Sequence, residues 1–459
     1  MKGAGFKILV PLLMAVGTVY AEPKHVIFAY VDHFEPYGTV EQANQMTSYW
    51  VDDYIAMASK HTDADGRHPI HSYFLICWPY IQLEQLNGVL NTLNKATYTG
   101  YGEVELHCHH GWPNEGLRTE QEATDELLYI LSLAKQEFNK HGALITAEAD
   151  PNVTFSFIHG MWALDNSRYN NWSGIPAHYE YCGVNREMDL LKREGSFADF
   201  TFPAPWPMDS TAHNLIYYAE DDNSPGSYHY LQNVFPVEVN CPPMDKLMII
   251  QGPYSRTNIG VKPEVYYDAP ELRRMDLWVG EQVHIIGNND WIFVKVYTHG
   301  LDCDVTYPET WDSYFGPTMD KFYYDIENKY NDGINWKLHY VSAREMYNIV
   351  KAAEAGKTGD PNDYRDFLIP QYANMRIFTE NNYNLITYNA EDIWFEILDN
   401  PETVDMSFKN FDTNVVVLES FNKGGPLYLS DATIETGESG ELRLQDTTTS
   451  RFYYIVKLF

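Results

Sequence analysis

Short apolar runs alternate with helix-like segments from residue 22 to about residue 365, and this alternation constrains the fold more than any other feature of the sequence. The runs have the length of strands and are rich in β-branched and aromatic residues. They cover residues 25–32, 72–78, 103–109, 153–159, 198–202, 246–250, 291–299 and 338–342. The segments between them, clearest at 117–140, repeat apolar residues every three or four positions, as amphipathic helices do. Such an order predicts a parallel sheet covered by helices.

Seven or eight strand–helix units predict an α/β fold, namely a (β/α) barrel of seven or eight parallel strands over residues 22–370. A doubly wound open sheet is the alternative. After about residue 370, short strand candidates follow one another with Asn, Asp, Gly and Pro between them and no helical pattern. Residues 371–459 are therefore expected to form a small antiparallel β-domain.

Residues 1–21 have the pattern of a signal peptide. Lys2 and Lys7 lie in its basic start, an apolar stretch follows, and Ala21 ends it. The pattern predicts a secreted or periplasmic protein. The stretch is too short to span a bilayer, and no other segment is long and apolar enough, so we expect no integral membrane segment after the leader is removed.

The chain is strongly acidic, with a formal net charge of −32 at pH 7 that becomes more negative when the two leader lysines are lost. Such a charge argues against nucleic acid as a partner and suits neutral or cationic ones, including partly deacetylated amino sugars. The aromatic content of 15% fits either a carbohydrate-binding cleft or a β-rich core. The five cysteines form no C-x-x-C pair and so indicate no Cys-based zinc site. The oligomeric state stays open.

Polar side chains close several of the apolar runs. In a barrel of parallel strands the active site lies at the carboxyl ends of the strands, so these residues are expected to converge. The first run ends with Asp32, His33 and Glu35, the third with His107, His109 and His110, the fourth with His159, Trp162 and Asp165, and the seventh with His299.

The third run carries the strongest signal for a metal. His107 and His109 lie at i and i+2 and share one face of a strand, while Cys108 points to the other face. Two imidazoles in this arrangement can bind one ion, as in zinc sites. His110 lies either beyond the strand or behind the first ligands. An acidic ligand together with imidazoles favours zinc, although other divalent ions fit as well.

Three further residues allow more than one interpretation. His299 fits a metal ligand, a general acid or a hydrogen-bonded core histidine, and His159 has the same ambiguity. Arg118 fits a residue that positions an anionic substrate, or a surface arginine that caps the following helix.

Over residues 24–365 the chain resembles the polysaccharide deacetylase superfamily, the NodB-homology carbohydrate esterases. The resemblance rests on "FAYVDH", "GEVELHCHH" and "VYTHG", and "FIHGMWALDNS" resembles the middle of a divergent branch. It implies Asp32 as the catalytic base, His33 as a metal ligand and His299 as the catalytic acid. Glu35 is the alternative base.

Two departures from the superfamily pattern concern the remaining motifs. His107 matches the first histidine of the H-x-x-x-H motif, but Gly111 stands at the second, so His109 or His110 must substitute. The later arginine-containing motif has no clear match.

The resemblance implies an exported, metal-dependent hydrolase that removes N- or O-acetyl groups from a polysaccharide or oligosaccharide. A zinc or other divalent ion would activate water, and His159, Trp162, Asp165 and Arg118 would contact the substrate. A glycoside hydrolase on the same barrel is one alternative, with its two carboxylates drawn from Glu35, Asp165 and Asp302. A non-catalytic glycan-binding protein is the other.

Overall fold

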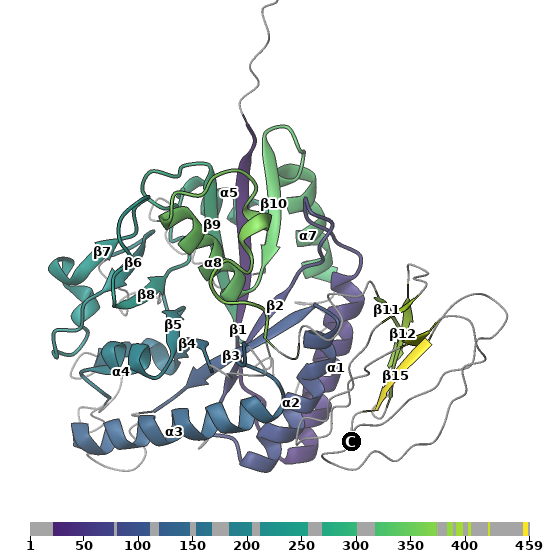
Figure 1. Ribbon diagram of the computed structural model, residues 1–459, viewed down its shortest axis with the longest axis horizontal. Helices are drawn as coiled ribbons and strands as arrows, with labels where there is room; N and C mark the ends of the chain where they lie inside the picture. The colour runs from purple at the N-terminus through teal and green to yellow at the C-terminus, as the bar shows by residue number, and fades with distance from the viewer. Residues whose placement is uncertain are drawn as a thin grey trace, which may run out of the picture.

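The structure is a computed structural model, and it describes residues 22–77, 80–110, 119–146, 153–167, 183–203, 212–255, 269–300, 317–372 and 374, together with five short strands after residue 382. A ten-stranded sheet forms its centre (Figure 1). The long strand β1 (Lys24–Phe34) pairs first with β10 (Trp336–Val341) and then with β2 (His71–Ile76). Strand β9 (Trp291–Thr298) pairs with β1 from His25 to Asp32.

From β2 the sheet continues through four more parallel strands and ends in two antiparallel ones. In spatial order these are β3 (Gly102–Cys108), β4 (Phe155–His159), β5 (Ser196–Asp199), β8 (Leu247–Ile250), β6 (Ile216–Ala219) and β7 (Val234–Pro236). The sheet is therefore mixed but mostly parallel, and its eight parallel strands are compatible with the predicted barrel. Within the described residues no pairing joins β8 to β9, so closure of the barrel is not shown.

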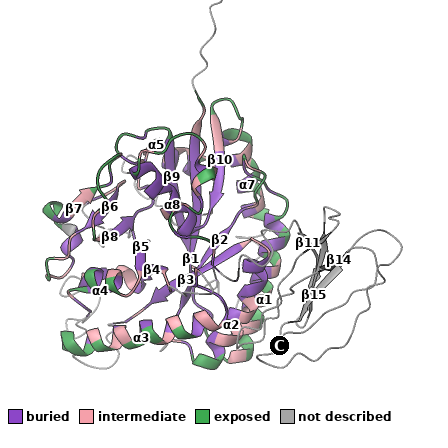
Figure 2. Cartoon of the chain, viewed as in Figure 1, coloured by how far each residue is buried: buried purple, intermediate pink, exposed green. Residues whose placement is uncertain are grey.

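Helices cover the sheet, and most begin after a strand. They are α1 (Val40–Ala58), α2 (Leu83–Tyr98), α3 (Glu120–Lys140), α4 (Glu187–Arg193), α5 (Leu272–Gly280), α7 (Pro317–Tyr330) and α8 (Ala343–Glu354), with short 3-10 turns η2 (Gly160–Trp162), η3 (Leu164–Asn166), η4 (Ser227–His229), η5 (Leu231–Asn233) and η6 (Pro361–Tyr364). Thr39, Thr119 and Ser342 begin α1, α3 and α8 with capping boxes, which satisfy the first free backbone N–H groups. Most strands of the ten-stranded sheet are buried, whereas the helices that cover it keep exposed faces (Figure 2).

The two faces of the sheet belong to two different cores. Val26, Phe28 and Tyr30 of β1 pack with α1 and α7 on what we call the outer face. Ile27 and Ala29 pack with α8 on the opposite, inner face. Because side chains alternate along a strand, consecutive residues at a strand end serve opposite faces.

A lysine on the inner face connects β9 to the segment after β5. Lys295 Nζ donates hydrogen bonds to the carbonyl oxygens of Phe200 and Phe202, at 2.7 and 2.5 Å. Burial lowers the pKa of Lys295 to about 7. This side chain links two parts of the sheet that no described strand pairing joins.

The strands beyond residue 382 are antiparallel. β11 (Tyr383–Tyr388), β12 (Asp392–Ile397) and β15 (Tyr453–Lys457) form one sheet, and β13 (Thr403–Val404) pairs with β14 (Phe421–Asn422). The boundary near residue 370 and the independence of the C-terminal part stay predictions. The predicted leader, residues 1–21, lies outside the described residues. Among the helices of the described residues, none has the length and apolarity that crossing a membrane requires.

Candidate metal centre

Side chains from the ends of β1 and β3 meet on the inner face of the sheet. His107 Nε2 lies 2.7 Å from Glu35 Oε1, His109 Nε2 lies 2.8 Å from the same oxygen, and the two nitrogens lie 3.0 Å apart. A ring nitrogen of His33 lies within 4.8 Å of the donor atoms of Glu35 and His107. We call His33, Glu35, His107, His109 and the adjacent His299 the inner cluster.

Neighbouring backbone holds these rings in place. His107 Nδ1 donates to the carbonyl oxygen of Ile158 at 3.0 Å, which directs Nε2 at Glu35. A Cβ atom on Gly160 would overlap the ring of His109, so only glycine leaves room for that ring. Tyr80 donates its hydroxyl proton to the carbonyl oxygen of His109 at 2.7 Å and fixes the backbone there.

The ionisation of the inner cluster suits a bound cation. Burial alone would raise the pKa of Glu35, but hydrogen bonds from His107 and His109 outweigh it and hold that pKa well below its usual range. Burial lowers the pKa of His33 and of His109. The cluster thus offers an ionised carboxylate beside the imidazoles of His33 and His109, which stay neutral, and metal ions require these forms.

The spacing of the donor atoms also fits a metal. Two ligands at 2.0–2.1 Å from one tetrahedral zinc ion lie about 3.3 Å apart. The atoms of Glu35, His107 and His109 lie 2.7–3.0 Å apart, a separation that small side-chain adjustments would bring to the zinc value. The donor set therefore fits a divalent cation of the zinc type.

His299 and Trp162 lie at the edge of the inner cluster. His299 follows β9, and its ring centroid lies 4.4 Å from that of His33 and 6.5 Å from that of Trp162. Both His299 and Trp162 are partly exposed, whereas His107 is fully buried. The two residues are therefore placed to meet a substrate that approaches the cluster.

Asp32 faces the other side of β1. Its carboxylate accepts hydrogen bonds from His71 Nε2 at 2.9 Å and from the backbone N–H of Gly300 at 2.7 Å. A Cβ atom on Gly300 would overlap this carboxylate. Asp32 is fully buried. Within the described residues its carboxylate hydrogen-bonds to the turn that follows His299 and to no residue of the inner cluster. These neighbours differ from those that the expected role of general base beside His33 requires.

His110 and His159 also point away from the inner cluster. With Glu187 at the start of α4 they form a second group on the outer face, the outer cluster, in which His110 Nε2 lies 3.0 Å and His159 Nε2 3.7 Å from Glu187 Oε1. Burial lowers the pKa of His159 to about 3 and raises that of Glu187 to about 7. Glu187 was not predicted because α4 has seven residues, too few for a clear helical period.

Two of the residues expected to bind substrate are buried, and a third is not described. His159 has no exposed surface, and Asp165 is equally buried and accepts hydrogen bonds from the backbone N–H and hydroxyl of Ser227. Neither side chain faces solvent, whereas Trp162 does in part. Arg118 lies outside the described residues.

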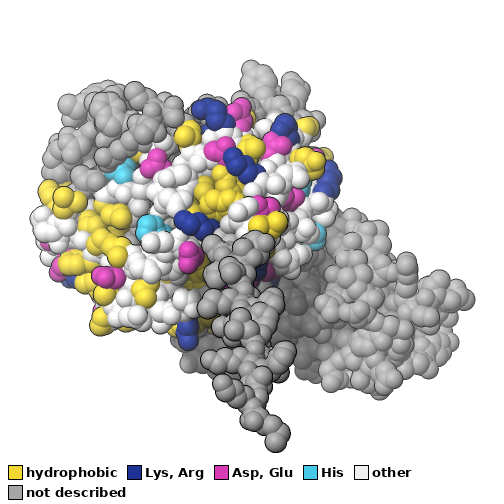
Figure 3. Space-filling view, turned by 90° about the horizontal axis from the view of Figure 1, so that it is seen from above, with side chains coloured by type: hydrophobic (Ala, Val, Ile, Leu, Met, Phe, Trp, Pro, Cys, Tyr) yellow, Lys and Arg dark blue, Asp and Glu magenta, His cyan; other side chains and the backbone are white. Residues whose placement is uncertain are grey.

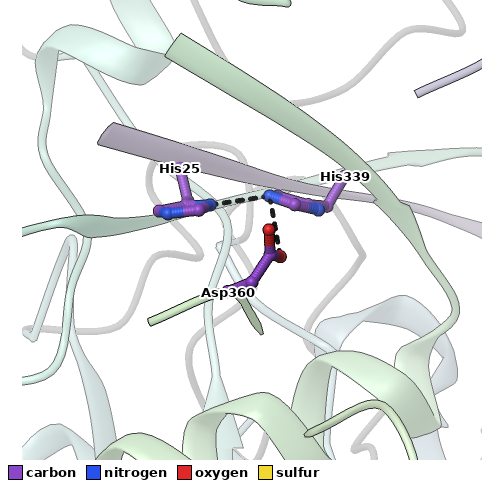
Figure 4. A group of neighbouring side chains, drawn as sticks. All are labelled: His25, His339 and Asp360. Carbon is purple, nitrogen blue, oxygen red and sulfur yellow. Dashed lines mark hydrogen bonds and ion pairs between the residues drawn. The ribbon is translucent and has the colours of Figure 1, made fainter. Parts of the chain in front are cut away.

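A further histidine group lies at the opposite end of β1 (Figure 4). His25 Nδ1 lies 2.8 Å from His339 Nε2, and His339 Nδ1 donates to Asp65 at 2.7 Å. Asp360 lies 3.9 Å from His339 and pairs with Lys337 at 2.8 Å. These donors already have partners in the protein, so hydrogen bonding accounts for the group. On the surface at this end, Lys and Arg side chains lie beside Asp and Glu (Figure 3).

Comparisons with known proteins leave the family open. No family model matches the sequence, and no curated protein matches it. Membership of the polysaccharide deacetylase superfamily is therefore not supported. Among the solved structures that match is an alpha-mannosidase from Enterococcus faecalis V583, with 9% identity and a TM-score of 0.36. The match covers 72% of this chain and only 29% of that one. At this TM-score the match establishes neither a shared fold nor a shared activity.

Proposed function

We propose that this protein is a metal-dependent hydrolase that acts on carbohydrate, with the inner cluster as its active site. The observation that carries the proposal is the convergence of Glu35, His107 and His109 donor atoms within 3.0 Å at the carboxyl ends of parallel strands. Partly exposed His299 and Trp162 lie beside this group. The favoured reaction is the removal of N- or O-acetyl groups.

The residues of the inner cluster have two proposed roles, metal binding and proton transfer, which we assign from their burial and position. His33, Glu35, His107 and His109 would hold the cation, because their donor atoms converge and burial keeps His33 and His109 neutral. A divalent cation supplies a Lewis acid there and lowers the pKa of a water molecule.

His299 is the group that moves protons in this proposal. A ring nitrogen of His299 accepts the proton of the attacking water and then donates it to the leaving amine or hydroxyl. Asp32 is a positioning residue, because its carboxylate binds the N–H of Gly300 and so fixes the turn that carries His299. This assignment replaces the general base that the superfamily resemblance implies.

Two features support carbohydrate as the substrate class. Trp162 is a partly exposed aromatic ring beside the inner cluster, and such rings offer a flat apolar face with a polar edge. The net charge of −32 favours neutral or cationic glycans over anionic ones. Export, if the predicted leader is cleaved after Ala21, would bring the enzyme to extracellular or periplasmic glycans.

Glycosidic cleavage is the competing reaction and requires two carboxylates on either side of the scissile bond. Glu35 lies in the cluster, but Asp165 is buried against Ser227, and Asp302 lies outside the described residues. Acetyl removal requires only the one carboxylate that the inner cluster contains, and for this reason we propose it first. Mannosides still belong among the substrates tested, because an alpha-mannosidase is among the structural matches.

The test is product analysis with the purified mature protein and a panel of acetylated and non-acetylated glycans. Release of acetate with no new reducing ends supports the proposal, and new reducing ends without acetate would replace it with glycosidic cleavage. His299→Ala is expected to lose turnover while it keeps bound metal. Metal binding with no turnover on any glycan would favour the binding-protein alternative.

A further inference from the structure

We propose that the outer cluster, His110, His159 and Glu187, is a second divalent-cation site, closed to solvent and structural in role. Its residues come from the end of β3, the end of β4 and the first residue of α4. A cation there would tie the short helix α4 to the sheet. This inference does not depend on the proposed hydrolase activity.

The three donor groups already converge without a bound ion. One donor atom from each residue lies within 4.8 Å of the other two. The rings of His110 and His159 lie 4.2 Å apart between centroids, and Glu187 Oε1 lies between 3.0 and 3.7 Å from their Nε2 atoms. All three side chains have no exposed surface. Imidazole nitrogens and a carboxylate oxygen are ligands that zinc binds, and the burial of all three side chains keeps substrate away from them.

Backbone contacts direct two of these donors toward a common point. His159 Nδ1 donates to the carbonyl oxygen of Gly160 at 2.6 Å, which orients the ring so that Nε2 lies 3.7 Å from Glu187 Oε1. Glu187 Oε2 accepts the N–H of Asp165 at 2.7 Å, which leaves Oε1 for the cluster. Contacts of this kind orient the ligands of metal sites.

The other carboxylate oxygen of Glu187 also indicates a bound cation. Glu187 Oε1 is buried and receives no hydrogen bond from the described residues, and its approach to His110 Nε2 lacks hydrogen-bond geometry. No described Lys or Arg pairs with Glu187. A buried carboxylate without such a partner costs several kcal/mol, and a bound cation would remove that cost.

The experiment counts zinc in the full-length mature protein after equilibration with zinc and removal of the excess. The wild type is expected to hold two equivalents and His107→Ala one, in the outer cluster. Glu187→Gln is also expected to hold one, because the amide keeps the shape but loses the charged ligand. The double variant should hold none. Cobalt loaded into His107→Ala should give the visible absorption of a protein-bound ion, and the double variant should not.

Glu105→Gln is the matched control. Glu105 is also fully buried, but its carboxylate accepts hydrogen bonds from the N–H of Ser156 and the hydroxyl of Tyr372, which belong to neither cluster. Its amide analogue should therefore keep both zinc equivalents. Circular dichroism confirms that each variant is folded. If Glu187→Gln does not fold, His107→Ala alone tests the proposal. Removal of its one zinc by a chelator must then lower its melting temperature.

The outcomes separate this proposal from the proposed function. A His107→Ala protein without zinc, or a folded Glu187→Gln protein that holds as much zinc as the wild type, overturns the outer site. If Glu187→Gln loses its zinc while His107→Ala keeps the wild-type amount, the outer site stands and the inner cluster loses its metal.

Discussion

At the residue scale, the alternation of side chains divides the histidine-rich sequence "HCHH" between two sites. His107 and His109 face the inner cluster, as their i, i+2 spacing predicts, whereas Cys108 packs in the outer core and His110 faces Glu187. The same rule separates Asp32 from His33, because adjacent residues of one strand cannot share a face. The resemblance to deacetylases implied that both residues act at one site, and the strand geometry places them apart.

Gly160→Ala should disturb the inner cluster without a large effect on the fold. A Cβ at this position would overlap the ring of His109, so the ring must move away from Glu35. We expect the zinc affinity of the inner cluster to fall by about 10–100-fold, the range seen when supporting contacts of a metal site are lost.

Metal titration measures this effect, and Gly280→Ala is the control. A Cβ on Gly280 meets no atom within 4 Å, and alanine is favoured over glycine in a helix, so Gly280→Ala should keep zinc affinity and gain up to about 1 kcal/mol of stability. Equal zinc affinities for the two variants would show that His109 does not contribute to the site.

At the element scale, the long apolar runs predicted the core of the fold well, and the short elements were missed. Each of the eight predicted strands overlaps a parallel strand of the sheet, because continuous apolar runs mark strands buried on both faces. Strands β6 and β7 have four and three residues, and α4 has seven, so they are too short for a periodic signal. Because α4 carries Glu187, the outer cluster could not be predicted from sequence.

Lys295→Met tests how β9 is joined to the rest of the sheet. The change keeps a long side chain but removes the hydrogen bonds to the buried carbonyl oxygens of Phe200 and Phe202. The carbonyl oxygen of Phe202 keeps the hydrogen bond from the N–H of Gly252 at 3.2 Å, so only that of Phe200 loses its partner. A buried carbonyl group without a partner costs about 1–3 kcal/mol, and we expect a loss of about this size in the free energy of unfolding.

Chemical denaturation gives this value, with Lys60→Met as the comparison. Lys60 forms an exposed ion pair with Asp320, and such pairs contribute less than about 1 kcal/mol. A similar small loss for Lys295→Met would mean that other contacts hold β9 in place.

At the scale of the whole molecule, buried neutral histidines should make the protein sensitive to mild acid. Burial lowers the pKa of His141 to about 4, below its ordinary value of 6.5. Between these two pH values the unfolded chain binds a proton that the folded chain does not, so stability falls as the pH falls. Each such histidine contributes about 1.4 kcal/mol per pH unit in this window. His25, with a pKa lowered to about 4, acts in the same direction in this window. His61 has a raised pKa, so its opposite effect on stability lies above pH 6.5.

His141→Gln should therefore flatten the dependence of stability on pH. We expect the slope of unfolding free energy against pH between about 4.5 and 6.5 to decrease by about 1.4 kcal/mol per pH unit. Denaturation at several pH values measures both slopes. Parallel curves for the variant and the wild type would show that His141 is protonated in the folded protein.

Several residues after Asp360, including two beyond residue 370, contact the first domain. Arg365 Nη2 lies 3.0 Å from Asp63, Tyr372 donates its hydroxyl proton to Glu105 at 2.9 Å, and the N–H of Asn374 donates to Gly142 at 3.1 Å. These partners lie far away in the sequence, so local composition could not reveal them. We expect the boundary of the first domain after Asn374 instead of at residue 370.

Two truncated chains test this boundary. A chain that ends at residue 374 keeps these buried contacts and should unfold cooperatively with the zinc content of the full-length protein. A chain that ends at residue 360 leaves Asp63 and Glu345 without Arg365, and losing one partner of a buried ion pair costs about 3–5 kcal/mol. We therefore expect it to unfold at a lower temperature. Equal melting temperatures would place the boundary before Arg365, and an unfolded longer chain would mean that the C-terminal strands are part of the same folding unit.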